Sequence, residues 1–256
     1  MIGSEQLREW DDRGFFFVRG FAPQDVTRAM WKRVVEVCRE RWGEDPGEGS
    51  LVMPESNLRA ETEAGAAKED LVSKVFKLHR DGVFRDFVES EPLVAISRQL
   101  IGTEVDCFLS QFIFKNPGAW GQPWHQDEFY FPFDRHPQVG FWLAVSDATL
   151  ENGCLYVLPG SHRDPVHEHV PDRRPNANVG YLEIVDRETT EAIPVPMRAG
   201  DLLVFHSRLM HCSSNNESDA PRAAMVYHVS ERGTVDHTGH TIVNDWMPIG
   251  DDPADG

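Results

Sequence analysis

Residues 125–127 set a histidine and an aspartate two positions apart, within the stretch PWHQDEFYF. Imidazole nitrogens and carboxylate oxygens bind transition metals, and two histidines with one carboxylate form the open triad of non-haem iron oxygenases. On an extended strand, residues i and i+2 face the same side, so His125 and Asp127 can reach one ion. The neighbouring aromatic residues Phe129, Tyr130 and Phe131 are candidates for the walls of a dry substrate pocket.

Two other His-x-Asp pairs occur, at His79-Arg80-Asp81 and at His162-Arg163-Asp164. The chain has 11 histidines, so chance alone can supply such pairs. The first pair ends a stretch with helical periodicity, where i and i+2 diverge, and the second follows a turn signal. We therefore expect both to be surface features.

A third metal ligand has to come from elsewhere in the chain, and two histidines follow the run GDLLVF, namely His206 and His211. His211 begins HCSSNNESDAPR, which supplies the hydroxyl of Ser213 and the guanidinium of Arg222. Arginine binds a carboxylate through two parallel hydrogen bonds, as a dicarboxylate co-substrate requires. The residues alone leave both histidines open as ligands, and leave open a zinc hydrolase or a non-catalytic ligand-binding protein.

The elements that must position these residues change character along the chain. Helical spacing of apolar residues predicts helices over 22–43, 69–81 and 91–102, and residues 47–67 read as a long loop or lid. From about residue 105, β-rich runs separated by turn residues predict strands within 104–115, 139–148, 154–161, 200–206 and 223–230. The pattern indicates one domain over 1–256, with 1–104 as mostly helical support and 105–235 as a β-sandwich or barrel.

Charge and composition restrict the partners. Asp and Glu number 42 against 25 Lys and Arg, for a formal net charge of -17, which disfavours nucleic acid and anionic lipid. We expect a small-molecule substrate, no nucleic acid and no membrane. The four cysteines form no CxxC motif and the first residues carry no signal-peptide pattern, so a cytoplasmic setting is expected.

Four stretches together resemble the phytanoyl-CoA dioxygenase family of Fe(II)- and 2-oxoglutarate-dependent oxygenases. They are PWHQD, FWLAVSDATLENGCLYVLPGSHR, AGDLLVFHSRLMHCSSNNESDAPR and the amino-terminal DRGFFFVRGFAPQDV, which cover nearly the whole chain. The resemblance implies a mainly β fold, a double-stranded β-helix (jelly roll, cupin-like) backed by amino-terminal helices. It also implies Fe(II), 2-oxoglutarate and O2 as cofactor and co-substrates.

The resemblance further implies roles for individual residues. It assigns iron to His125, Asp127 and His211, and the distal carboxylate of 2-oxoglutarate to Arg222 with the help of Ser213. It also implies that three residues line the co-substrate or substrate pocket, namely Trp142, Gln111 and Lys115.

Asp127 bears on the reaction that the resemblance implies. Related halogenases carry a small residue at this position, so the aspartate favours oxygenation over halogenation. Hydroxylation of an unactivated C–H bond, with release of succinate and CO2, is the default expectation. The substrate is expected to be a secondary metabolite, an amino-acid derivative or a lipid-like acid. Desaturation, cyclisation and epoxidation would use the same triad and remain open.

Overall fold

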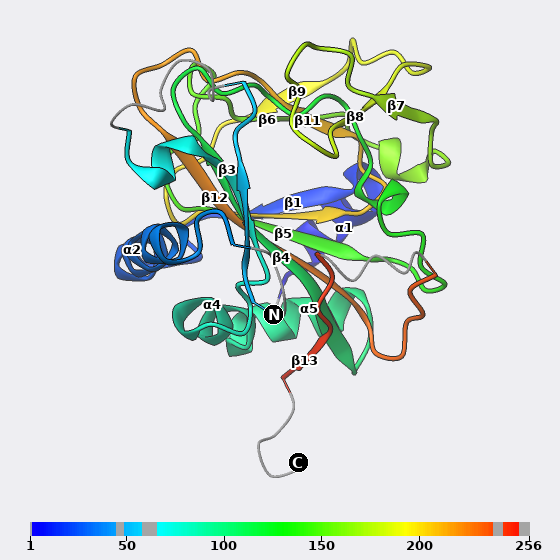
Figure 1. The fold of residues 1–256 in the computed structure, drawn as a ribbon. Coiled ribbons are helices and arrows are strands. Elements are labelled where there is room, and N and C mark those ends of the chain that lie inside the picture. The colour runs from blue at the N-terminus through cyan, green and yellow to red at the C-terminus, as the bar shows by residue number, and fades with distance from the viewer. Residues whose placement is uncertain (1, 45–48, 58–65, 238–242, 251–256) are drawn as a thin grey trace.

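The computed structural model describes residues 2–44, 49–57, 66–237 and 243–250, and is built around one large antiparallel sheet (Figure 1). The helices are α1 (Ser4–Arg13), α2 (Gln24–Glu40), α4 (Gly82–Val88) and α5 (Glu91–Leu100). The strands are β1 (Phe15–Val18), β2 (Leu51–Pro54), β3 (Val72–Phe76), β4 (Val105–Lys115), β5 (Val139–Ala144), β6 (Leu155–Val157), β7 (His169–Pro171), β8 (Leu182–Ile184), β9 (Ile193–Val195), β10 (Leu202–His206), β11 (His211–Ser213), β12 (Arg222–Glu231) and β13 (Met247–Ile249).

The large sheet has the strand order β1-β10-β5-β12-β4-β3-β2, with β13 added beside β4. Two smaller sheets, β11-β6-β9 and β7-β8, complete the sandwich. In Figure 1 these short strands lie on one side of the large sheet, whereas α2, α4 and α5 lie on the other. This arrangement is the expected mainly β, jelly-roll architecture backed by helices.

The side chains of strand β12 alternate between the two hydrophobic layers on either face of the large sheet. Ala223, Met225 and Tyr227 pack into the cluster shared with the helices, and Val226 packs into a second cluster between the sheets. Successive side chains of a strand point to opposite faces, so each strand of this buried sheet serves both layers. Arg222, at the start of the strand, lies on the inner face with Val226 and carries its guanidinium into the sandwich.

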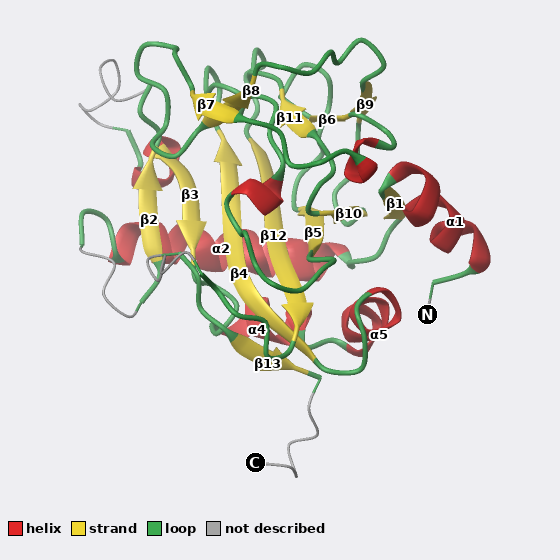
Figure 2. Ribbon diagram, turned by 90° about the vertical axis from the view of Figure 1, so that its right-hand side faces the viewer, coloured by secondary structure: helices red, strands yellow, loops and turns green. Residues whose placement is uncertain are grey.

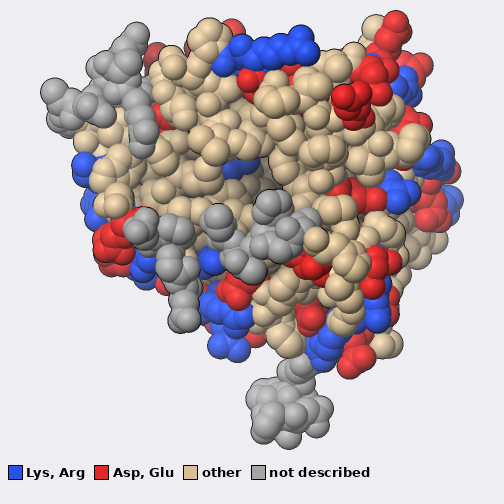
Figure 3. Space-filling view, turned by 45° about the vertical axis from the view of Figure 1, so that its right-hand side comes forward, with Lys and Arg blue, Asp and Glu red and all other residues tan. Residues whose placement is uncertain are grey.

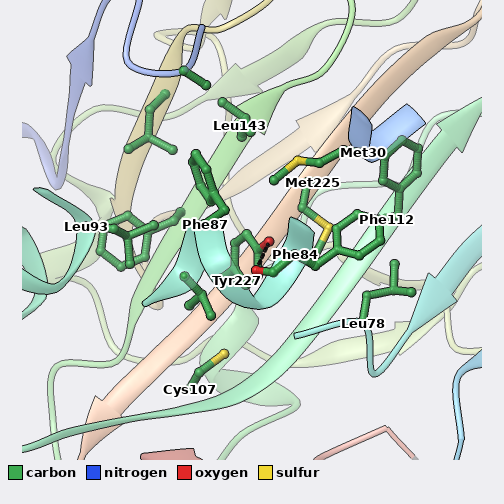
Figure 4. Packing of buried hydrophobic residues seen from close by; sticks show 14 of the residues in the cluster. Met30, Leu78, Phe84, Phe87, Leu93, Cys107, Phe112, Leu143, Met225 and Tyr227 are labelled. Carbon is green, nitrogen blue, oxygen red and sulfur yellow. Dashed lines mark hydrogen bonds between the residues drawn. The ribbon is translucent and has the colours of Figure 1, made fainter. Parts of the chain in front are cut away.

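The helical layer is held by apolar packing and by one buried hydroxyl. Met30 of α2 and Phe87 of α4 pack into the cluster with Met225 (Figure 4). The Tyr227 hydroxyl donates a 2.9 Å hydrogen bond to the carbonyl oxygen of Phe84. Each fully buried large apolar side chain contributes about 1.5–3 kcal/mol, so this layer gives the sheet a rigid outer support.

The helices predicted over 22–43 and 91–102 are confirmed as α2 and α5, but the one over 69–81 is wrong. Lys68–Leu71 form a 3-10 turn, and Val72–Phe76 form strand β3 between β2 and β4. The β-branched valines and the alternation of buried Val75 with Lys74 suit a strand, and two neighbouring strands supply its hydrogen bonds.

Strand pairing in the first hundred residues also departs from the expected helical support. Strand β1 pairs with β10 at the edge of the large sheet, and β2 lies at the opposite edge (Figure 2). The segment 47–67 was expected to be a loop or lid, yet Leu51–Pro54 are strand β2. The remainder of that expectation falls partly on residues 47–48 and 58–65, which lie outside the described residues. Among the described residues, no helix combines the length and apolarity needed to cross a membrane.

Candidate active site

The structure brings three predicted ligands together at one point. One ligand atom from each of His125, Asp127 and His211 lies within 4.8 Å of the others. The Nε2 atoms of His125 and His211 lie 3.5 and 3.7 Å from Oδ1 of Asp127. Two imidazoles and one carboxylate converging in a buried place are a donor set that suits Fe(II) and leaves further coordination positions open. The chemistry of these side chains therefore fits an iron ion.

The backbone reaches this convergence by a route that differs from the sequence prediction. His125 and His211 form an isolated antiparallel bridge, in which each backbone nitrogen lies 3.0 Å from the carbonyl oxygen of the other residue. Asp127 does not continue a strand; it begins the 3-10 turn Asp127–Phe129. The predicted same-side geometry of i and i+2 on a strand is therefore wrong, and the turn delivers the carboxylate instead.

Hydrogen bonds to backbone carbonyls orient both imidazole rings. Nδ1 of His125 lies 2.8 Å from the carbonyl oxygen of Pro123, and Nδ1 of His211 lies 2.9 Å from that of Leu209. A proton on Nδ1 satisfies each carbonyl and leaves the Nε2 lone pair facing the cluster. Both rings are thus fixed in the tautomer that a metal ligand needs.

The protonation states suit metal binding near neutral pH. Burial lowers the pKa of His211 to about 4, so its imidazole is neutral at pH 7. Burial alone would raise the pKa of Asp127, but His211 and His228 more than offset it, and the pKa lies below its usual range. His211 therefore offers a neutral nitrogen, and Asp127 an ionised carboxylate, at neutral pH.

His228 is a fourth histidine at the cluster, and the sequence analysis missed it. Its Nε2 lies 3.7 Å from Oδ2 of Asp127, the oxygen that faces away from the two ligand imidazoles. Burial lowers the pKa of His228. The available signal was periodicity, since His228 is six residues after Arg222 on one strand and so shares its face.

A cavity of about 300 Å³ opens beside the cluster, on the inner face of the large sheet. Figure 3 shows a face of the molecule hollowed near its centre, with uncharged residues around most of the rim and basic atoms visible inside. Tyr130 and Phe131 line this cavity as predicted, whereas Phe129 is exposed and stacks on His169. The prediction for Phe129 as a pocket wall is therefore wrong, because the 3-10 turn points this ring outward.

Arg222 lies at one end of the cavity and is 1% exposed. Its Nε and Nη2 donate to the carbonyl oxygen of Gly153 at 3.1 and 3.0 Å, and within the described part of the chain its Nη1 has no hydrogen-bond partner. The guanidinium carbon lies 5.5 Å from the ring centroid of Trp142. Burial lowers the pKa of Arg222 to about 10, so it is charged at pH 7. A buried cation with an unused donor is a place prepared for an anion.

The predicted pocket residues Lys115, Ser213 and Gln111 all line the same cavity. Nζ of Lys115 donates to Oγ of Ser213 at 2.7 Å and to the carbonyl oxygen of Ser214 at 2.5 Å. Burial holds the pKa of Lys115 well below its usual value. Oγ of Ser213 also accepts from the backbone N–H of Gln122 at 3.1 Å, so its own proton is left to donate elsewhere.

Lys74 is a further cavity residue that the sequence analysis missed. A helix was expected over this segment, and it gave no reason to place the Lys74 side chain in the pocket. From strand β3 it lines the cavity, and its Nζ donates to Oε1 of Gln122 at 3.0 Å. Its ammonium lies 5.1 Å from the ring centroid of Tyr181. Burial lowers the pKa of Lys74 to about 8, which keeps it mostly protonated at pH 7. The cavity therefore holds a second cation besides Arg222.

Two other histidines have roles away from the cluster. His206, the alternative third ligand, stacks against Trp10 and His162 at centroid distances of 5.6 Å each. His79 was expected at the surface but is 0% exposed, so that prediction is wrong. Its Nδ1 lies 2.8 Å from Oγ of Ser110, and its Nε2 lies 2.7 Å from the carbonyl oxygen of Asp245. His79 thus connects strand β4 to the C-terminal segment.

Solved structures similar to this chain show how widely the fold is used. EvdO2 from Micromonospora carbonacea var. aurantiaca, complexed with 2-oxoglutarate, is 22% identical with a TM-score of 0.69, over 93% of this chain and 94% of that chain. The epimerase SnoN in complex with Fe3+, alpha ketoglutarate and nogalamycin RO is 20% identical with a TM-score of 0.68, over 97% and 91%. At these identities the likeness shows a shared fold.

Comparison of the sequence with known families gives a closer assignment. The Bos taurus phytanoyl-CoA dioxygenase domain-containing protein 1 is 29% identical over 91% of this chain and 92% of that relative. Phytanoyl-CoA dioxygenase 1 of Oryza sativa subsp. japonica is 28% identical over 89% of each chain. The model of the phytanoyl-CoA dioxygenase (PhyH) family matches residues 10–224, which is well over half of the chain. The chain therefore belongs to the phytanoyl-CoA dioxygenase family and is a 2-oxoglutarate-dependent dioxygenase that uses iron and O2.

Proposed function

We propose that His125, Asp127 and His211 hold the Fe(II) ion and that the enzyme hydroxylates an unactivated C–H bond of a small molecule. One observation carries the proposal: the three ligand atoms within 4.8 Å of one another belong to residues of the same cavity that holds the unpaired Nη1 of Arg222. A metal site and an anion site in one cavity are what a metal enzyme with a dicarboxylate co-substrate requires.

Arg222 and Ser213 are the proposed partners of the distal carboxylate of 2-oxoglutarate. Arg222 uses Nε and Nη2 to hold the Gly153 carbonyl, which orients the guanidinium and leaves Nη1 to the ligand. The Ser213 hydroxyl accepts from Lys115 and from the backbone N–H of Gln122, so its proton is available to the same carboxylate. Lys115 therefore acts through Ser213 as a positioning residue.

The remaining roles concern the iron ion and the dryness of the site. Bound iron, together with 2-oxoglutarate and O2, supplies the oxidising chemistry, with succinate and CO2 as co-products. Asp127 offers one carboxylate oxygen to the metal, and His228 stands at the other oxygen, 3.7 Å away. Trp142 covers the guanidinium, and Phe131 and Tyr130 exclude water from the wall beside the triad. Gln111 lies between these regions, where a hydrogen bond to 2-oxoglutarate or to the substrate is within its reach.

Hydroxylation is the proposed outcome, because a triad with its carboxylate intact supports oxygen insertion and needs no further group. Structural neighbours of this chain include a carbocyclase and an epimerase, so the same fold serves other outcomes in those proteins. Substrate placement relative to the iron decides between these outcomes. The cavity of about 300 Å³ is at the lower end of the range for small-molecule sites and must also hold 2-oxoglutarate. A secondary metabolite or amino-acid derivative is therefore favoured over a substrate enclosed together with a coenzyme A moiety.

Product analysis tests the proposed reaction. Enzyme with Fe(II), 2-oxoglutarate and ascorbate would be given a panel of small molecules under 18O2, with succinate release as the screen. A product heavier by one 18O atom, with a new hydroxyl group located by NMR, establishes hydroxylation, whereas an epoxide of the same mass refutes it. A product lighter by two hydrogens establishes desaturation or ring closure and refutes hydroxylation. Iron and 2-oxoglutarate binding without substrate-dependent succinate would favour the non-catalytic alternative.

A further inference from the structure

The cavity has two chemically different ends, and the strand register shows which residues lie at each end. On β12 and β4, Arg222 pairs with Lys115 and His228 pairs with Leu109. The first pair marks the cationic end proposed for 2-oxoglutarate. The second pair lies six residues further along β12, next to Asp127 through the 3.7 Å contact of His228. The end beyond the triad is therefore the part left for the substrate.

The walls of this substrate end are mainly apolar. Lys74 of β3 pairs with Ile113, and Phe76, two residues further from the cationic end, pairs with Gln111. Phe76, Leu109, Phe131 and Val243 pack in one cluster and line the cavity. The C-terminal segment contributes Val243 and, immediately after it, the polar residue Asn244.

Asn244 has an unmet hydrogen-bonding need. It is 8% exposed, and its Nδ2 donates to Oδ2 of Asp236 at 2.8 Å. An ionised carboxylate only accepts hydrogen bonds, so this contact fixes which end of the amide faces Asp236. The amide oxygen Oδ1 is buried and has no hydrogen-bond partner among the residues that the structure describes. Buried acceptors are nearly always satisfied in native proteins. Asn244 lines the cavity, so a ligand that donates to Oδ1 would supply the missing partner.

The segment that carries Asn244 is held firmly. Nε and Nη2 of Arg80 donate to the two carboxylate oxygens of Asp245 at 2.6 and 2.8 Å, and Nη2 also donates to the carbonyl oxygen of Trp246 at 2.6 Å. His79 contacts the carbonyl oxygen of Asp245 at 2.7 Å, and the Asp245 N–H donates to the Phe108 carbonyl at 2.8 Å. A specificity group on a segment fixed in this way discriminates between ligands better than one on a free loop.

We propose that Asn244 is a specificity-determining residue that accepts a hydrogen bond from a neutral hydroxyl or N–H group on an apolar substrate body. This assignment rests on the proposed function, since it takes the opposite end of the cavity for 2-oxoglutarate. A carboxylate has no proton to donate to Oδ1. An ammonium group would share the cavity with the cations Lys74 and Arg222. The nearby carboxylates already have partners, because Asp127 is the proposed iron ligand and Asp236 accepts from the Asn244 amide. The neutral donor is the remaining class that fits both the acceptor and its surroundings.

The test compares matched probes on the enzyme loaded with Fe(II) and 2-oxoglutarate without oxygen. Benzyl alcohol and toluene differ by one hydroxyl group, and benzoate and benzylamine supply the charged alternatives. Proton relaxation of each probe, enhanced by the nearby paramagnetic iron, gives its affinity. The wild-type enzyme should bind the alcohol about tenfold more tightly than toluene, because one buried acceptor gains its partner. Benzoate and benzylamine should bind more weakly than the alcohol.

Asn244→Leu should remove this preference while toluene binding is kept or improved, and Asn244→Ala provides the same test with no added bulk. Val235→Ala, at a 47% exposed position upstream in the same segment, is the matched control and should keep the tenfold preference. A wild-type enzyme without a preference for the alcohol, or a preference that survives in both Asn244 variants, refutes the assignment. The visible absorption band of the Fe(II)–2-oxoglutarate chelate is recorded in every sample. Its absence from the wild type would instead refute the proposed function, so the two failures are distinguishable.

Discussion

The Arg222→Met variant separates the effect of this buried arginine on folding stability from its effect on 2-oxoglutarate binding. Arg222 is 1% exposed, and its hydrogen bonds to described residues go to the carbonyl oxygen of Gly153 and not to a carboxylate. Burial lowers its pKa from 12.5 to about 10. A lowered pKa means that the folded state destabilises the charged form of the guanidinium. At pH 7, below both pKa values, this penalty is fully present and amounts to about 3 kcal/mol.

The substitution removes that penalty but also removes two hydrogen bonds to Gly153, a loss of about 1–3 kcal/mol. The two effects nearly cancel, so the free energy of unfolding without ligands should stay within about 2 kcal/mol of wild type. Binding of 2-oxoglutarate should suffer far more. Two charge-assisted hydrogen bonds are lost, at about 1.5–3 kcal/mol each, so the dissociation constant should rise at least about 100-fold.

Arg222→Lys is the matched variant, because it keeps the charge and loses the forked geometry. We expect its dissociation constant for 2-oxoglutarate to rise about tenfold, between wild type and Arg222→Met. Anaerobic calorimetric titration of 2-oxoglutarate into Fe(II)-loaded protein measures the affinities, and urea denaturation measures the stabilities. An affinity for 2-oxoglutarate within threefold of wild type in Arg222→Met would refute the assigned role. A loss of more than about 4 kcal/mol in its stability would refute the electrostatic reasoning.

Two further predictions concern acid stability and the glycine beneath Arg222. The pKa of His211 is lowered by burial to about 4, so the unfolded state takes up its proton first as the pH falls from 6.5. This residue should therefore contribute a loss of about 2–3 kcal/mol between pH 7 and 4.5 in metal-free protein, measured by urea denaturation as the difference between wild type and His211→Ala, and the same pH dependence in both would contradict this. Gly153 has φ +90°, and an added Cβ would lie 2.4 Å from Cδ of Lys115 and 2.7 Å from the carbonyl oxygen of Ser214. Gly153→Ala should destabilise the protein by about 1–3 kcal/mol and weaken 2-oxoglutarate binding, and wild-type values for both would show that this region can relax.

The chemistry of the site was more predictable from the sequence than the backbone that delivers it. The residue types predict a metal site that includes His125 and Asp127, and the family resemblance selects His211 over His206 and iron over zinc. The bridge between His125 and His211 and the turn at Asp127 depend on contacts between segments far apart in the sequence. Periodicity within one segment carries no information about such contacts.

The errors at strand β3 and at His79 have the same physical origin. The run around Val72–Phe76 is short, and its apolar residues fit both helical and strand spacing until neighbouring strands supply hydrogen bonds. His79 is polar and follows that run, so it was expected at the surface. It is buried because Ser110 and the Asp245 carbonyl, which are distant in sequence, satisfy both ring nitrogens. Lys74 and Asn244 were missed as cavity residues for a similar reason, since their side chains meet the site only in the folded chain.

The most direct test of the iron assignment is an anaerobic titration of metal-free protein with Fe(II) and 2-oxoglutarate, followed by visible absorption. It needs no substrate and reports on the metal and the co-substrate together. The wild-type protein should develop the weak charge-transfer band of the chelate, and His211→Ala should lose it. His206→Ala, which changes a histidine that packs against Trp10 away from the cluster, should retain the band. A wild-type protein that binds no iron and forms no band, or an unchanged band in His211→Ala, would contradict the assignment of His125, Asp127 and His211 as the iron site.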